Sequence, residues 1–261
     1  DIMRKYGKEE VDNFAAGLKS GDYVLKQIDK PSAQRPYWLL DSKTGERVAI
    51  IKPSSIKDGW DIKREAISQR IMEELRGQNA IGFQSPACTK MQVEINGKSE
   101  TCLVERIARG ADLEDLPVGH HYTVVDQLAE ERAVSAFLLD FDRHSANEKV
   151  DEGLSLIAID RGYSGLGQIQ NIGNLSDAQL EARVVRDFLS IGADKPGKDV
   201  IIKNVENLMT YNQMEGVVKS VEGWDAAKIR AMLGEIVDTD GQRLLTDAEI
   251  DDTTRTLLAS R

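Results

Sequence analysis

Cysteine and histidine are scarce in this sequence. The 261 residues include two cysteines, three histidines and no Cys-x-x-Cys pair. A structural zinc site needs four such ligands at short spacings, so the sequence gives almost no support to a site of this class. Unpaired thiols favour a reducing compartment. We therefore predict a cytoplasmic protein, and delivery into another cell stays open.

The two cysteines flank Asn96-Gly97, which is the strongest short signal for a β-hairpin. A two-residue loop at this place puts Cys102 opposite Met91. By the same register, Cys88 lies opposite Glu105. The two sulfurs then belong to different rungs of the hairpin, so we expect no disulfide between them.

Long apolar runs and an excess of cationic residues are also absent. No stretch approaches the roughly 18 consecutive apolar residues of a membrane-spanning helix, and no apolar segment follows residues 1–4 as it would in a signal peptide. The 34 Lys and Arg residues face 44 Asp and Glu, a net charge of −10. Nucleic acids and anionic membranes attract cationic surfaces. We therefore expect neither a nucleic-acid partner nor stable insertion into a membrane.

The first part of the chain combines short strand patterns with one helical pattern. The expected elements are strands over 23–28, 37–40 and 47–51, a helix over 62–75 and a hairpin over 89–105. The first three strands are joined by tight turns and predict an antiparallel meander. Together these elements predict a small α+β unit.

The second part is predicted to be mainly helical. Apolar residues at helical spacing cover 124–139, and capping boxes begin at Ser176 and Thr246. Two short strand-like runs, near Phe141 and over 156–159, bracket a loop. A boundary near residues 106–112 separates the mixed part from the helical part.

A polar segment, Asp142-Arg143-His144-Ser145-Ala146-Asn147, follows the long helical pattern. Phosphoryl transfer needs a group that orients or deprotonates the acceptor hydroxyl, and an oxygen ligand for Mg²⁺. Asp142 or His144 fits the first role and Asn147 the second. The alternative interpretation is a turn rich in Asp and Asn with one hydrogen-bonded histidine, since short polar motifs recur by chance.

Asp160 follows the apolar run 156–159 and precedes Arg161-Gly162. A carboxylate at the end of a strand suits a hard metal ion that triphosphate oxygens also bind. Gly162 is expected to let the backbone turn sharply. The alternative is an ordinary Asp-x-Gly turn at the end of a strand.

Lys52 ends the third expected strand, and Glu65 follows on the expected helix. A lysine that points into a cleft can bind the α- and β-phosphates of a nucleotide, and Glu65 can hold it there by an ion pair. Arg64 and Lys63 are alternative partners of Glu65. A surface lysine and a solvated glutamate are the alternative interpretation.

The loop between the first two strands, residues 31–36, lies where a phosphate-binding loop belongs, although it lacks Gly-x-Gly. Its backbone N–H groups and the Ser32 hydroxyl can bind phosphate. A plain turn between two prolines is the alternative. Each of these four features is weak alone, and their order along the chain is the stronger argument.

Residues 30–165 resemble the catalytic domain of the phosphoinositide 3/4-kinase superfamily, which includes large protein kinases. The matching motifs are Ser32-x-x-Arg35-Pro36, Ile50-Ile51-Lys52-Pro53, Asp142-Arg143-His144-x-x-Asn147 and Ile159-Asp160-x-Gly162. The resemblance implies an α+β, bilobal protein-kinase-like fold. Its small antiparallel-sheet N-lobe would be residues 1–108, and its mainly helical C-lobe residues 109–261.

The resemblance also implies a site for ATP and Mg²⁺ between the lobes. The adenine would lie against the backbone of 103–107, including Val104 and Glu105. The implied phosphate-site residues are Ser32, Gln34, Arg35, Lys52 and Glu65. Asn147 and Asp160 would hold Mg²⁺, His144 or Asp142 would orient the acceptor hydroxyl, and Arg143 would buttress the loop.

One residue and one segment depart from the family pattern. Arg161 stands where many relatives carry an apolar or aromatic residue, and residues 163–175 contain no Lys or Arg. Anionic headgroups need cationic partners, so we expect no polyphosphorylated inositol lipid as acceptor. Protein Ser/Thr is slightly favoured over phosphatidylinositol. Transfer of AMP, or a catalytically inactive kinase-shaped binding module, are the alternatives, since a fold does not dictate its chemistry.

Overall fold

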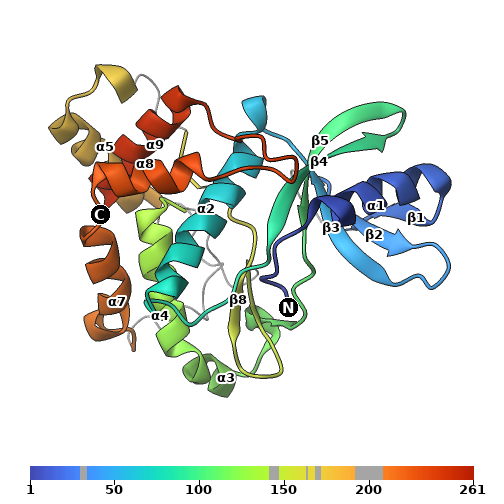
Figure 1. The fold of residues 1–261 in the computed structure, drawn as a ribbon. Helices are drawn as coiled ribbons and strands as arrows, with labels where there is room; N and C mark the ends of the chain where they lie inside the picture. Colours follow the sequence, from blue (N-terminus) through green and yellow to red (C-terminus); the bar gives the residue numbers. More distant parts are fainter. Residues whose placement is uncertain (30–33, 141–146, 163, 168–171, 192–207) are drawn as a thin grey trace.

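The computed structural model describes residues 1–261 apart from 30–33, 141–146, 163, 168–171 and 192–207. It is an α+β protein with an antiparallel sheet and several helices, as the sequence predicts (Figure 1). The strand predicted near Phe141 lies outside the described residues. No helix within the described ranges is long and apolar enough to cross a membrane.

The larger sheet has five strands. They are β1 (Tyr23–Gln27), β2 (Tyr37–Asp41), β3 (Arg47–Pro53), β4 (Cys88–Ile95) and β5 (Lys98–Glu105). Their order is β1-β2-β3-β5-β4, with every neighbouring pair antiparallel. The predicted meander and hairpin are therefore confirmed.

The hairpin between β4 and β5 has the predicted register. Asn96 and Gly97 both have positive φ, 52° and 76°, as a two-residue loop that matches the twist of the strands requires. Met91 pairs with Cys102, and Cys88 pairs with Glu105. Both cysteines are free, as expected from this register.

A helix that the sequence analysis did not predict covers one face of this sheet. Helix α1 (Lys8–Ser20) buries Val11 and Phe14 against apolar side chains of β2, β3, β4 and β5. It ends at Gly21, whose φ of 85° is the left-handed conformation usual after a helix. Its start has no side-chain cap, which removes the signal that marks a helix N-terminus in a sequence.

Helix α2 (Trp60–Gly77) follows the 3₁₀ turn η1 (Lys57–Gly59) and matches the predicted helix. Its apolar residues Ile67, Ile71 and Leu75 belong to the largest hydrophobic core, which they share with helices from the second part of the chain. In Figure 1, α2 lies among these helices, whereas α1 lies with the sheet. Although α2 comes from the first part of the sequence, it is packed against the second.

The second part contains a small sheet and six described helices. The strands are β6 (Ala111–Asp112), β7 (Glu148–Val150) and β8 (Leu156–Ala158). The helices are α3 (Val118–Thr123), α4 (Val125–Phe137), α5 (Asp177–Ile191), α7 (Tyr211–Glu222), α8 (Ala226–Gly234) and α9 (Asp247–Ser260). Two 3₁₀ turns, η2 (Leu113–Asp115) and η4 (Ile172–Asn174), complete it.

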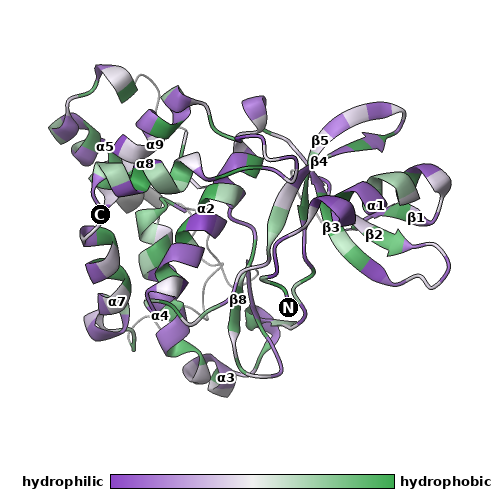
Figure 2. Ribbon diagram, in the orientation of Figure 1, coloured by the Kyte–Doolittle hydropathy of each residue, from purple (hydrophilic) through white to green (hydrophobic). Residues whose placement is uncertain are grey.

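The helices of this part pack around the largest core and around a smaller one, which α5 shares with Leu139 and Ile172. Hydropathy colouring shows polar and apolar residues mixed along α2 and α4 (Figure 2). Their apolar sides meet those of α7, α8 and α9 around Leu128, Val217, Met232 and Leu257. The predicted capping box at Thr246 is present, and the side chains of Ser176 and Gln179 exchange the equivalent hydrogen bonds with each other's backbone.

Strand β6 pairs with β7, and so holds residues 106–110, which connect β5 to β6, close to β7. Ala111 pairs with Val150, and Gly110 passes so close that an added Cβ would lie 2.7 Å from the carbonyl oxygen of Val150. Only glycine permits this approach of the two backbones. Gly110 therefore fixes where the connection from the large sheet meets the β7–β8 hairpin.

We expect Gly110→Ala to lower the free energy of unfolding by about 1–3 kcal/mol, because the new methyl group forces two backbones apart. Chemical denaturation measures the change. Gly119→Ala is the matched control, since nothing lies within 4 Å of a Cβ at this position in α3. Equal stability of the two variants would contradict the prediction.

Candidate functional site

Lys52 lies near the end of β3 and is buried. Its Nζ donates a hydrogen bond to Oε2 of Glu105 at 2.8 Å and lies 3.7 Å from Oδ1 of Asp160. In the β3–β5 register Ile50 pairs with Glu105. Alternation along a strand puts Ile50 and Lys52 on one face, so Lys52 and Glu105 are diagonal neighbours on the same face.

This geometry corrects the predicted partner of Lys52. The ion pair is made with Glu105, while Glu65 accepts a hydrogen bond from the backbone N–H of Arg161 at 2.6 Å. Glu105 sits on the strand beside Lys52, so the sheet itself delivers the closer carboxylate. From the sequence, Glu105 was expected to contribute only its backbone, as an adenine contact. Its signal was a lone carboxylate ending the apolar run 102–104.

The alternative partners proposed for Glu65 also bind elsewhere. Lys63 pairs with Glu249 of α9 at 2.6 Å. Arg64 donates to the carbonyl oxygens of Leu166 at 2.7 Å and Gly162 at 3.1 Å. Arg64 and Glu65 together therefore attach α2 to the segment that follows Asp160.

Asp160 has an unusual backbone conformation. Its φ of 59° lies in the left-handed region, where residues other than glycine are uncommon and where Asp is among the better tolerated. The sequence analysis assigned the sharp turn to Gly162, but Gly162 does not have a positive φ. Backbone strain of this kind is found preferentially at functional sites, where surrounding contacts maintain it.

The two expected metal ligands are neighbours in the structure. The backbone N–H of Ile159 donates to the carbonyl oxygen of Asn147 at 3.0 Å, so Asn147 lies across the β7–β8 hairpin from the residue before Asp160. The Oδ1 atom of Asp160 is buried and accepts no hydrogen bond. A carboxyl oxygen without a hydrogen-bond donor is suited to bind a cation.

The oxygen donors of this pair are compatible with one mode of metal binding. Within the described residues, no group of three or more His, Cys, Asp and Glu side chains is arranged to hold a metal. A protein-only cage is therefore not present among them. Mg²⁺ at nucleotide sites instead uses one or two protein oxygens together with phosphate oxygens and water. Asp160 and Asn147 are of the type that this mode requires.

The charges around Lys52 are unbalanced. Burial alone would lower the pKa of Lys52, but the carboxylates of Asp160, Glu105 and Glu65 outweigh burial and raise the pKa above its usual value. Burial raises the pKa of Glu65 to about 8, with Lys52 opposing the rise and the other two carboxylates adding to it. Three acidic side chains thus share one cation.

Gln34 and Arg35, two of the three phosphate-site residues expected in this loop, are described. Gln34 is buried, and its Nε2 donates to Oδ2 of Asp61 at the start of α2 at 3.1 Å. Arg35 is exposed and has a φ of 45°. The structure thus ties the end of this loop to α2. Ser32 lies outside the described residues, as do Asp142, Arg143 and His144.

The expected adenine contacts, residues 103–107, lie partly within β5 and partly in the segment that follows it. Val104 is fully buried and pairs with Ile51 on β3 and Thr89 on β4, and Glu105 is the last residue of β5. The backbone of Val104 is thereby used within the sheet. A groove of about 1,220 Å³ opens further along, and Ile107, Gly110 and Ile157 are among its lining residues. The segment after β5 therefore borders an open groove, whereas Val104 does not.

Comparison with known proteins adds no relative. The sequence matches no protein-family model and no curated protein. What points to a function in this chain is the order of its motifs and the geometry of Lys52, Glu65, Glu105, Asn147 and Asp160.

The pKa of Glu65 predicts a pH-dependent stability. Its folded value of about 8 exceeds the ordinary value of 4.5, so the carboxyl takes up a proton on folding between these limits. Stability from this group is complete below the unfolded pKa and is lost as the pH rises through the folded pKa. Glu65→Gln, which does not titrate, should gain on the order of 2–5 kcal/mol relative to the parent between pH 5 and 9.

Denaturant titrations of parent and variant across this pH range measure the difference. Glu94→Gln, on an exposed position of β4, controls for loss of one negative charge. A constant difference between Glu65→Gln and the parent would show that Glu65 is ionised in the folded protein throughout.

Proposed function

We propose that the protein is a Mg-ATP-dependent kinase that transfers the γ-phosphate of ATP to a hydroxyl group. The observation that carries the proposal is the convergence of Lys52, Glu105, Glu65 and Asp160 from separate segments, with Oδ1 of Asp160 buried and not hydrogen-bonded. The proposal includes a bilobal protein-kinase-like fold, with residues 1–108 as N-lobe and 109–261 as C-lobe.

The excess of negative charge explains why a cation belongs at this site. Even with Glu65 protonated, the carboxylates of Glu105 and Asp160 face the single ammonium of Lys52. A buried charge without compensation is costly. Asn147 and Asp160 would hold Mg²⁺, which neutralises phosphate charge when it is bound. This arrangement favours a ligand that brings both a divalent cation and anionic oxygens.

The remaining roles follow from position. Lys52, held by Glu105, binds the α- and β-phosphates, and the segment after β5 binds the adenine. Ser32, Gln34 and Arg35 belong to the phosphate loop by resemblance. The residues of this chain would promote transfer chiefly by positioning and by charge neutralisation.

A second set of residues would act on the acceptor hydroxyl. By the same resemblance, Asp142 or His144 orients this hydroxyl, and Arg143 buttresses the loop that carries them.

The acceptor that we favour is a protein Ser or Thr, ahead of phosphatidylinositol. Residues 163–175 follow Asp160, where phosphoinositide kinases typically carry basic residues for the headgroup, and they contain no Lys or Arg. A phosphorylated headgroup would find no cationic partner in this stretch. An uncharged hydroxyl on a protein side chain needs none.

Transfer of label from γ-labelled Mg-ATP tests the function. The protein is incubated with phosphatidylinositol vesicles and with cell proteins, and the organic and protein fractions are counted separately. We expect label on protein, reduced at least about a hundredfold in Asp160→Asn and Lys52→Met, because each removes a charge that acts on the transferred phosphate. Lys43→Met, at an exposed lysine, is the control with parental activity.

The other outcomes identify other functions. Label in the organic fraction identifies a phosphatidylinositol kinase. Label transferred from α-labelled ATP identifies AMP transfer. Mg-ATP binding without Asp160-dependent transfer identifies an inactive kinase-shaped binding module, and absence of binding contradicts the nucleotide site altogether.

Thermal unfolding with Mg-ATP provides a test of binding alone. At a ligand concentration of 100 times the Kd, mass action should raise Tm by about 5–10 °C. ATP with a chelator should give a much smaller rise, because the cluster around Asp160 repels an anion without its metal. Asp160→Asn should respond equally to ATP with and without Mg²⁺. A parent Tm that does not change when Mg-ATP is added would contradict the prediction.

A further inference from the structure

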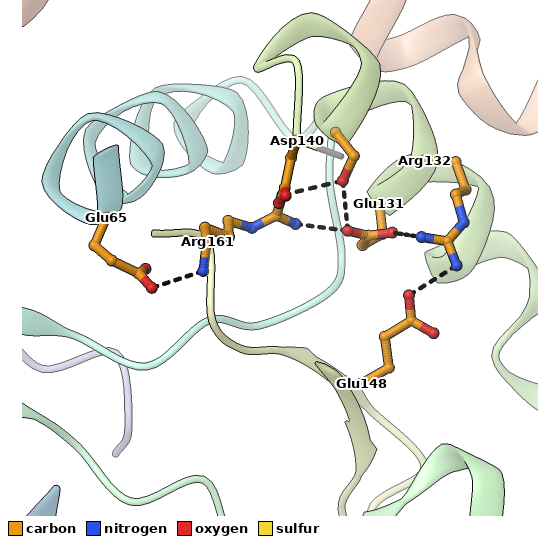
Figure 3. A network of polar contacts seen from close by, with 7 residues as sticks. Glu65, Glu131, Arg132, Asp140, Glu148 and Arg161 are labelled. Carbon is orange, nitrogen blue, oxygen red and sulfur yellow. Dashed lines mark hydrogen bonds and ion pairs between the residues drawn. The ribbon is translucent and has the colours of Figure 1, made fainter. Parts of the chain in front are cut away.

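The side chain of Arg161, next to Asp160, is completely buried at the centre of a polar network (Figure 3). Its guanidinium donates to Oε1 of Glu131 at 2.8 Å and to Oδ2 of Asp140 at 3.1 Å. It also donates to Oγ of Ser135 at 3.1 Å. A planar guanidinium can bind several acceptors at fixed angles, so these contacts determine its orientation.

The network continues to the strand that follows Asn147. Oε2 of Glu131 accepts from Arg132 at 2.9 Å, and Arg132 is 3.0 Å from Oε1 of Glu148, the first residue of β7. Glu131 and Glu148 are both completely buried. A continuous path of charged groups therefore joins Arg161 to the residue directly after Asn147 (Figure 3).

The backbone of Arg161 is held from the opposite side. Its N–H donates to Glu65 of α2 at 2.6 Å, while its side chain reaches Glu131 of α4. The peptide group between Asp160 and Arg161 is thus fixed by two helices. This is the peptide that follows the left-handed φ of Asp160, and strained backbone persists where surrounding contacts over-determine it.

We propose that Arg161 is a positioning residue that holds the two metal-binding residues, Asp160 and Asn147, in register before ligand binds. It acts on Asp160 through the shared peptide and on Asn147 through Glu131, Arg132 and Glu148. This inference rests on the proposed kinase function. It assigns a role to the residue that departs from the family pattern, since the apolar or aromatic residue that many members of that family carry could not make these contacts.

Arg161→Lys tests the proposal because it keeps the positive charge and loses the planar guanidinium with its several N–H donors. One ammonium cannot reproduce the three directed contacts. We expect the Mg²⁺ concentration for half-maximal transfer to rise about tenfold or more, with kcat reduced and the KM for ATP at saturating Mg²⁺ little changed. Half-saturation by Mg²⁺ does not depend on the fraction of folded enzyme, so a purely structural role would leave it unchanged.

Lys90→Met is the matched control. It also removes a cation from a buried carboxylate, because Lys90 pairs with Asp238 at 3.0 Å, but it does so away from Asp160. We expect a lowered Tm and a parental Mg²⁺ requirement. If Arg161→Lys does not fold, Glu131→Gln replaces it, since the amide keeps an acceptor for Arg161 and loses the charge. The same direction of change is expected, with a smaller size.

The measurement separates this inference from the proposed function. Transfer by the parent together with a parental Mg²⁺ requirement in Arg161→Lys and Glu131→Gln overturns the positioning role and leaves the kinase intact. Failure of the parent to bind Mg-ATP in the thermal assay overturns both. A raised Mg²⁺ requirement in Arg161→Lys that Lys90→Met does not share supports both.

Discussion

Compensation of buried charge is the constraint on which this structure depends. Arg161 has no contact with solvent, so its charge must be met by the protein, and a buried ion pair is tolerated only when its geometry and hydrogen bonds are good. Glu131 and Asp140 meet this demand from α4 and the residues that follow it. A small displacement of Arg161 would lengthen these ion pairs and leave its buried charge uncompensated.

Two charged clusters meet at one peptide. Asp160 belongs to the cluster of Lys52, Glu105 and Glu65, while the side chain of Arg161 belongs to the network of α4 and β7. In the first cluster three acidic side chains surround the single ammonium of Lys52. In the second, Arg161 and Arg132 are paired with Glu131, Asp140 and Glu148. Asp160 and Arg161 are adjacent in the sequence, and yet their side chains belong to different clusters.

The sequence predicted β1 to β5, β8, α2 and the β4–β5 register because periodicity and Asn96-Gly97 are local signals. It missed the short strands β6 and β7 and helix α1, which starts without a side-chain cap, and it paired Lys52 with Glu65. The choice between Glu65 and Glu105 depends on how β3 pairs with β5, which no local pattern specifies. The order of the motifs placed Asn147 near Asp160, but the partners of Arg161 come from segments distant in sequence, and their burial appears only in the fold.

The pairing of Lys52 with Glu105 inside one sheet has a mechanical consequence. Both residues belong to the five-stranded sheet, whereas Asp160 follows β8 and α2 is packed with the helices of the second part. A rigid rotation of the sheet would carry the ammonium and its carboxylate partner together. The separation of 3.7 Å between Lys52 and Asp160 would then change with the angle of rotation, whereas the distance from Lys52 to Glu105 would not.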